Sequence, residues 1–222
     1  MPVVVFDLDG TLVHSAPDIA WHLNAAIAAH CESVPSLSED DVEMLIGGGL
    51  MDLIIRGFAA LDLAPDDATL DATITSYRKM YLASPVVKTT LYPGVEDMLS
   101  ALKNAGYGIA LCTNKSEDTA HAVLRHFDLL PMFDAVVGGD TTPTRKPDPA
   151  SLLAAVERAG GVPGRAVMVG DSKADAGAAH AAGTSLILVD WGYSAVNVHD
   201  LGGDAVISSY DGFIDQVAPL AG

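Results

Sequence analysis

Short apolar runs that alternate with longer helical segments are the feature that most constrains how this chain can fold. The runs are rich in β-branched residues and lie between turn-forming residues, which is typical of buried strands. They span Val3 to Phe6, Gly108 to Cys112, Ala135 to Val137, Ala166 to Val169 and Ser185 to Val189. Helical patterns cover Val95 to Asn104, Glu117 to Phe127, Pro149 to Ala159 and Ala174 to Ala182. This alternation predicts an α/β fold, with a Rossmann-like parallel sheet covered by helices on both faces.

One long interval interrupts this alternation, because it contains several helical patterns and no convincing strand. Ser15 to Pro17 precede a helix that we expect to begin at Asp18, Ser38 is a typical N-cap, and Pro65 to Asp67 open a further helix. Such an insert, placed between the first and second core strands, predicts a separate all-helical cap domain. We therefore expect a core of residues 1–14 and 85–222 and a cap domain of residues 15–84.

The strong negative charge of the chain limits its partners. The formal net charge is −17, from 29 acidic and 12 basic residues, and this repels nucleic acids and anionic membrane surfaces. We therefore expect neither partner. An anionic substrate would also be repelled at long range, so its attraction would have to come from a metal ion and a few well-placed cations.

Features that would direct the chain to a membrane or out of the cell are not found. The apolar runs are much shorter than the roughly 20 residues that cross a bilayer, and the N-terminus lacks a basic segment followed by a cleavage site. The two cysteines, Cys31 and Cys112, show neither disulfide-framework nor metal-ligand spacing. We expect a cytoplasmic protein, monomeric or a homodimer.

Polar residues follow four of the expected strands, at the edge where ligands bind in open parallel sheets. Asp7-Leu8-Asp9-Gly10-Thr11 follows the first strand and Thr113-Asn114-Lys115 the second. Arg145-Lys146-Pro147-Asp148-Pro149 follows the third after a loop, and Gly170-Asp171-Ser172-Lys173-Ala174-Asp175 ends the fourth. These strand ends would bring several carboxylates, a hydroxyl group and one or two cations into one crevice.

The chemistry of these groups favours phosphoryl transfer. Asp7 and Asp171 on neighbouring strands would repel each other unless a hard cation joined them, and oxygen ligands favour Mg²⁺. The transition state spreads negative charge over the phosphoryl oxygens, which Thr113, the Asn114 backbone and Lys146 could stabilise. Asp7 and Asp9 have the spacing needed to divide nucleophilic work from acid–base work.

Each motif taken alone has a simpler structural reading. Asp-X-Asp-Gly is commonly a turn or a calcium-type loop, and Thr113 or Ser116 could merely cap the following helix. Lys146 lies in a proline-bounded loop, where a lysine is usually solvated. The joint order and position of the motifs supports catalysis, because independent turns have no reason to place complementary groups at successive strand ends.

The four segments, in this order, resemble the haloacid dehalogenase superfamily of phosphohydrolases over nearly the whole chain. The resemblance implies that Asp7 is the nucleophile, Asp9 the general acid and base, Thr113 a phosphate ligand and Lys146 the charge stabiliser. It also implies that Mg²⁺ is held by the Asp7 carboxylate, the Asp9 backbone carbonyl and Asp171, with Asp175 supporting these ligands from behind.

Further motifs are similar to the phosphoglycolate phosphatase branch of that superfamily. They are Ser15-Ala16-Pro17-Asp18-Ile19-Ala20, Tyr92-Pro93-Gly94-Val95, Gly138-Gly139-Asp140-Thr141 and Gly192-Tyr193, together with Thr113-Asn114-Lys115. The chain departs from the usual pattern at His14, where aspartate is common, and at Ala174, where asparagine is common. Neither position belongs to the expected catalytic set.

The substrate depends on the cap, where Gly48 and Gly49 could let the backbone approach a ligand and Arg56 could meet a carboxylate. A plain turn between helices and a solvated arginine are the competing interpretations. The leading substrate is 2-phosphoglycolate, and the alternatives are a sugar phosphate, an amino-sugar phosphate or pyrophosphate. A phosphomutase could use the same aspartates, and a phosphate- or metal-binding module without turnover is the non-enzymatic alternative.

Overall fold

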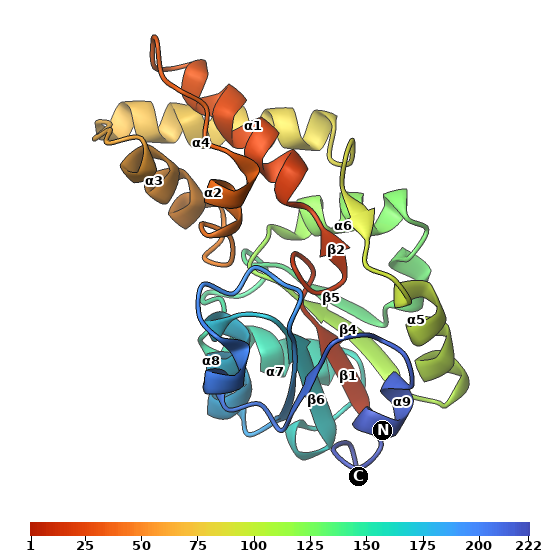
Figure 1. The fold of residues 1–222 in the computed structure, drawn as a ribbon. Helices are drawn as coiled ribbons and strands as arrows, with labels where there is room; N and C mark the ends of the chain where they lie inside the picture. Colours follow the sequence, from red (N-terminus) through yellow and green to blue (C-terminus); the bar gives the residue numbers. More distant parts are fainter.

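A parallel sheet of six strands forms the centre of the structure, a computed structural model that describes residues 1–222 (Figure 1). The strand order is β5-β4-β1-β6-β7-β8. The strands are β1 (Val3–Phe6), β4 (Gly108–Cys112), β5 (Ala135–Val137), β6 (Ala166–Gly170), β7 (Ser185–Val189) and β8 (Ala205–Ile207). The five predicted strands are confirmed. The edge strand β8 was not predicted, because it has three residues of which only Ile207 is buried, too few to show a pattern.

Helices cover both faces of the sheet, as predicted. Val4 and Phe6 of β1 pack into one hydrophobic cluster with α5 (Val95–Asn104), α6 (Glu117–His126) and α9 (Phe213–Val217). Val3 and Val5 point to the opposite face and pack with α7 (Pro149–Arg158) and α8 (Lys173–Ala182). Alternate side chains of a strand point to opposite faces, so an apolar run without polar interruptions requires cover on both sides. Short 3₁₀ helices cover Leu130–Met132, Pro163–Arg165 and Val198–Leu201.

Four helices form a separate group beyond one end of the sheet (Figure 1). They are α1 (Ala16–Ala28), α2 (Glu39–Glu43), α3 (Leu50–Ala60) and α4 (Asp67–Ala83). We call residues 15–84 the helical insert. Two predicted caps are present: Ser38 and Asp41 form a capping box, and the Asp66 side chain accepts a hydrogen bond from the Thr69 N–H group. The first helix begins at Ala16, two residues before the expected Asp18, and Ser15 makes no side-chain cap hydrogen bond. The start of α3 was not predicted, because Gly49 precedes it and supplies no side-chain cap.

A two-stranded antiparallel ribbon joins the insert to the core. It pairs β2 (Val13–His14) with β3 (Thr90–Leu91), one strand on each side of the insert. Neither strand was predicted, since two residues are too few to show a periodicity. The ribbon brings the entry and exit of the insert together.

Asp18 fixes the returning chain beside the entry of the insert. This α1 side chain is fully buried and accepts hydrogen bonds from the backbone N–H groups of Val87, Lys88 and Thr89 and from Thr89 Oγ1, at 2.6 to 3.0 Å. Burial alone would raise the pKa of the Asp18 carboxyl, but these hydrogen bonds lower it below its usual value.

Asp18→Asn is expected to lower the free energy of unfolding by about 1–3 kcal/mol at pH 7, because it removes charge-assisted hydrogen bonds. A carboxyl with a lowered folded-state pKa stabilises the protein above its unfolded pKa, and this contribution is lost as the pH falls through the folded value. Urea unfolding of both proteins at pH 7 and pH 3 should show the difference shrinking in acid. A difference that stays constant between the two pH values would contradict this account.

None of the helices combines the length and the apolar character needed to cross a membrane.

Candidate active site

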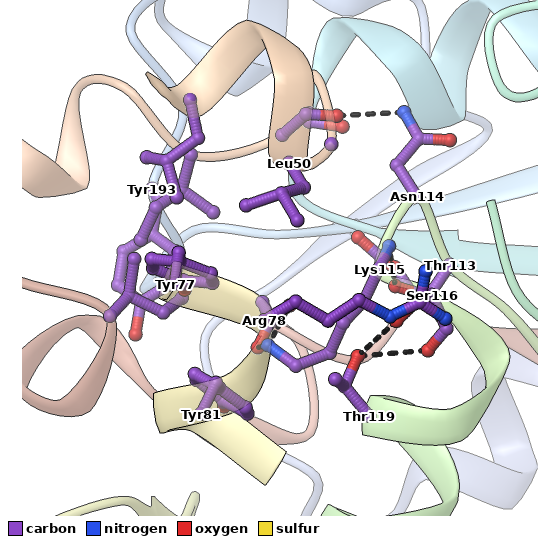
Figure 2. A pocket seen from close by; sticks show the side chains of 18 of the residues that line it. Leu50, Tyr77, Arg78, Tyr81, Thr113, Asn114, Lys115, Ser116, Thr119 and Tyr193 are labelled. Atoms are coloured by element: carbon purple, nitrogen blue, oxygen red, sulfur yellow. Dashed lines mark hydrogen bonds and ion pairs between the residues drawn. The ribbon is translucent and has the colours of Figure 1, made fainter. Parts of the chain in front are cut away.

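The carboxyl ends of three adjacent strands meet at the end of the sheet that faces the helical insert. Phe6, the last residue of β1, pairs with Leu111 of β4 on one side and with Val169 of β6 on the other. The register therefore places the residues that follow these strands next to one another. Asp7, Thr113 and Asp171 line one pocket with residues of the insert. Figure 2 shows this pocket with Thr113 and the insert residues Leu50, Tyr77 and Tyr81 labelled.

Lys146 does not line this pocket, but it joins two carboxylates, one of which does. Its Nζ atom is 3.0 Å from Asp7 Oδ1 and donates hydrogen bonds of 2.6 Å to Asp175 Oδ1 and to the Cys112 carbonyl. The lysine side chain is 1% exposed, so its charge is almost completely removed from water. Burial alone would lower the pKa of Lys146, but the Asp175 and Asp7 carboxylates raise it above the ordinary value. Lys146 is therefore a permanent cation at the base of the site.

Asp7 and Asp171 carry more negative charge than their surroundings compensate. Burial raises the pKa of Asp7 to about 6, with Lys146 opposing this rise and Asp175 adding to it. Burial, followed by repulsion from Asp175 and Asp7, holds the pKa of Asp171 well above its usual range. Carboxylates in this condition favour a bound cation.

The cluster of buried acidic groups has the donors that a hard divalent cation needs. Oxygen atoms of Asp7, Asp171 and Asp175 lie within 4.8 Å of one another. Both carboxylate oxygens of Asp175 already accept hydrogen bonds from the protein. Oδ1 accepts one from Lys146, and Oδ2 accepts three, from the Asp171 and Ser172 N–H groups and from Ser172 Oγ. This leaves Asp7 and Asp171 as the carboxylates best placed to hold the ion, with Asp175 orienting the loop behind them.

Asp171 is held rigidly by residues on both sides. Thr11 Oγ1 donates to Oδ1 at 3.0 Å, and the Tyr193 N–H group donates to Oδ2 at 2.7 Å. Gly10 approaches the same carboxylate so closely that a Cβ atom there would lie 2.6 Å from Asp171 Oδ2, and its φ angle is +82°. Only glycine satisfies both conditions without strain.

Tyr193, whose N–H group binds Asp171, also contacts the start of the insert through its hydroxyl group. Its hydroxyl oxygen accepts hydrogen bonds from the N–H groups of Ser15 at 2.7 Å and Ala16 at 3.1 Å. With both lone pairs used, the hydroxyl proton is directed to His14 Nδ1, 2.9 Å away. His14 Nε2 lies 3.3 Å from Glu39 in α2. His14 therefore serves the contact between core and insert, and it does not line the pocket.

Asp9 lines the same pocket as Asp7. Its Oδ1 atom accepts a hydrogen bond of 2.6 Å from Ser15 Oγ. Both of its carboxylate oxygens lie 3.1 Å from Lys115 Nζ. Lys115 was quoted in the sequence motif but was not among the predicted site residues, and its position directly after Thr113-Asn114 was the available signal. The fold brings it to Asp9 from the neighbouring strand end.

Two of the predicted phosphate ligands, Thr113 and Asn114, follow the end of β4. Thr113 is buried and lines the pocket. Asn114 Nδ2 donates to the Gly47 carbonyl at 2.7 Å and to the Lys146 carbonyl at 3.0 Å. Asn114 thus joins the insert to the Lys146 loop, a contact that sequence spacing could not reveal.

The insert presents a different set of residues to the pocket than the sequence suggested. Gly47 and Gly49 line the pocket, whereas Gly48 does not. Arg56 also lies outside it, with its guanidinium donating to the Met44 and Leu45 carbonyls. The structure therefore does not bring Gly48 or Arg56 to the candidate site. A second cation that was not predicted, after Lys115, is Arg78 of α4, which lines the pocket and was hidden in an ordinary helical pattern.

Aromatic and aliphatic side chains of the insert form the remaining wall. Tyr77 and Tyr81 of α4 stack with ring centroids 5.7 Å apart, and Leu50 of α3 faces the same space (Figure 2). This wall is largely apolar, and the Tyr81 ring lies against Lys115, whose Nζ atom is 4.6 Å from the ring centroid. The pocket therefore combines charged groups at the strand ends with aromatic and aliphatic groups from the insert.

A parallel sheet with buried carboxylates at its strand ends, a lysine joining them and a helical insert after the first strand defines a class of hydrolases. The model of the haloacid dehalogenase-like hydrolase family matches residues 1–183. This chain belongs to that family.

The chain is also similar to phosphatases from several bacteria. It is 44% identical to the phosphoglycolate phosphatase of Cereibacter sphaeroides over 221 residues, 99% of each chain. It is 42% identical to that of Caulobacter vibrioides over 207 residues, 93% of this chain and 86% of that protein. The crystal structure of a predicted phosphoglycolate phosphatase from Haemophilus somnus superimposes with a TM-score of 0.89 at 28% identity and covers 97% of each chain. The resemblance stated from the sequence is confirmed, and the protein is a phosphatase.

Proposed function

We propose that this protein hydrolyses 2-phosphoglycolate to glycolate and phosphate, with Mg²⁺ as cofactor and phosphorylated Asp7 as intermediate. The observation that carries the proposal is the position of Asp7 at the end of β1, buried, 3.0 Å from Lys146 and within 4.8 Å of the other acidic ligands. Relatives that are 42% and 44% identical over most of the chain and are named phosphoglycolate phosphatase support the substrate.

In the first half of the reaction, a carboxylate oxygen of Asp7 attacks phosphorus. A bond forms between this oxygen and phosphorus, the bond from phosphorus to the ester oxygen breaks, and Asp9 gives a proton to the departing oxygen. In the second half, Asp9 takes a proton from water as the water oxygen attacks phosphorus, which releases phosphate and restores Asp7.

The groups around the phosphoryl position stabilise its charge. Thr113, the Asn114 backbone and Lys146 would bind the phosphoryl oxygens, and the electrostatic stabilisation is strong because the site is shielded from water. Asp7, the Asp9 backbone carbonyl and Asp171 would hold Mg²⁺, with Asp175 orienting them. The ion, when bound, would neutralise charge on the carboxylates and on the phosphoryl group.

We propose that the helical insert is a cap that closes over the substrate. It contributes Leu50, Tyr77 and Tyr81 to the pocket wall and contacts the core through Asn114. The ribbon formed by β2 and β3 lies between insert and core, so the two crossings near Ser15 and Ser84 are the expected hinges.

Phosphate release from a panel of esters tests the function. The panel contains 2-phosphoglycolate, sugar phosphates, an amino-sugar phosphate, pyrophosphate and an aryl phosphate, each with Mg²⁺ and with chelator. We expect kcat/KM to be highest for 2-phosphoglycolate and all release to stop with chelator. A higher kcat/KM for a sugar phosphate would reject the substrate assignment, while transfer of phosphate between sugar positions without release would indicate a phosphomutase.

Mg²⁺ is expected to raise the midpoint temperature of thermal unfolding, because the ion binds only the folded carboxylate cluster. Asp171→Asn removes one ligand and should abolish most of this rise. Thermal unfolding monitored by circular dichroism at increasing Mg²⁺ concentrations measures the effect independently of turnover. Asp204→Asn, which changes the same charge at a position outside the pocket, is the matched variant and should keep the response to Mg²⁺. An equal rise in wild type and Asp171→Asn would remove Asp171 from the ligand set.

A further inference from the structure

We infer that Lys115 binds the carboxylate of the substrate and is the residue that selects an ester bearing such a group. This inference rests on the proposed function, which supplies the reaction but assigns no residue of the pocket to the carboxylate. The candidates for that role are the cations that line the pocket, namely Lys115 and Arg78.

The position of Lys115 meets the first requirement, which is nearness to the leaving group. In 2-phosphoglycolate a single methylene group separates the ester oxygen from the carboxylate. The ester oxygen must lie at Asp9 if Asp9 is to give it a proton, so the carboxylate must lie close to Asp9 as well. Lys115 Nζ lies 3.1 Å from both Asp9 oxygens. A substrate whose carboxylate is bound by this ammonium group can therefore keep its ester oxygen, one methylene group away, next to Asp9.

The surroundings of Lys115 meet the second requirement, which is an ion pair shielded from water. The Lys115 side chain is 8% exposed, and its Nζ lies 4.6 Å from the centroid of the Tyr81 ring. Tyr77 stacks on Tyr81 and extends this wall. An ammonium–carboxylate contact is considerably stronger in such a site than in water. A neutral substituent in the same place would leave the buried ammonium with Asp9 alone.

Arg78 meets neither requirement. Its Nη2 atom lies 3.5 Å from Asp118 and 3.9 Å from Asp140, on the core side of the pocket rim. Its side chain is 47% exposed. These contacts direct the guanidinium toward core carboxylates and away from Asp9, so Arg78 is suited to holding the insert against the core.

Binding of two non-hydrolysable ligands tests the inference without turnover. The acid is 3-phosphonopropionate, in which a methylene group replaces the ester oxygen of 2-phosphoglycolate, and the second ligand is its neutral carboxamide. Calorimetric titration with Mg²⁺ present should show that wild type binds the acid about 10- to 100-fold more tightly than the amide, the range for a charge-assisted contact. Lys115→Met and Lys115→Gln should reduce this ratio to about threefold or less.

Matched variants on α4 separate the role of Lys115 from a general loss of positive charge. Lys79→Met removes an exposed lysine one residue from Arg78 and should keep the wild-type ratio. Arg78→Met should also keep it. If Arg78→Met loses the ratio while both Lys115 variants retain it, the inference is overturned in favour of Arg78.

Hydrolysis of 2-phosphoglycolate by the same proteins distinguishes failure of the inference from failure of the proposed function. If wild type hydrolyses it and the Lys115 variants keep the acid-to-amide ratio, the function stands and the inference is overturned. If wild type prefers the acid through Lys115 but turns over another carboxylate-bearing ester faster, the substrate assignment fails and the inference stands. If wild type binds acid and amide equally, the inference is overturned whatever the panel of esters shows.

Discussion

Asp7→Asn should reduce phosphate release from 2-phosphoglycolate by about 10⁴-fold or more, the scale expected when a nucleophile is removed. The amide has nearly the shape of the carboxylate, but its oxygen is a poor nucleophile and cannot form the phosphorylated intermediate. Steady-state assays with Mg²⁺ measure the loss. The purified variant must be checked by mass spectrometry, because deamidation of a small fraction would restore active protein.

Asp71→Asn is the matched control for this experiment, since it makes the same change on the exposed face of α4. It should retain the wild-type rate. Full activity in Asp7→Asn, with the asparagine verified, would show that another residue attacks phosphorus and would rule out the proposed intermediate.

Lys146→Met is the second change with a large expected effect, here on stability. The lysine is 1% exposed and lies between Asp7 and Asp175, so its removal leaves two buried carboxylates without their cation. Breaking a buried ion pair in this way lowers the free energy of unfolding by about 3–5 kcal/mol. Urea unfolding in chelator measures this without compensation by a metal ion.

Lys103→Met provides the comparison, because Lys103 pairs with Asp134 at 2.7 Å while both side chains remain 30% and 36% exposed. An exposed pair contributes less than about 1 kcal/mol. Equal losses of unfolding free energy in the two variants would contradict this account. They would mean that burial does not determine how much Lys146 stabilises the protein.

The predicted site residues that the structure brings together at the strand ends share a physical origin in the parallel sheet. Asp7, Thr113 and Asp171 each follow a buried strand directly, and the parallel register then brings them together. A strand end is visible in the sequence because its apolar run stops there. Lys146 does not follow a strand directly, and it reaches the site because its loop returns to the same edge of the sheet.

The residues that were missed act between segments far apart in the chain. Lys115 reaches Asp9 across 106 positions, and Tyr193 reaches Asp171 and the start of α1 from a loop near the C-terminus. Arg78 reaches the pocket from a helix whose sequence pattern is that of any amphipathic helix. No local pattern marks such contacts.

The sequence by itself therefore determined the class of fold, the all-helical nature of the insert and the carboxylates at the strand ends, because strand and helix periodicities and cap residues are local properties of the chain. The tertiary structure alone decided which cations line the pocket. Arg56 hydrogen-bonds carbonyl groups of its own insert, while Lys115 and Arg78 line the pocket. The reason is that the direction of a long charged side chain depends on the packing of the insert against the core, which spacing along the chain does not specify.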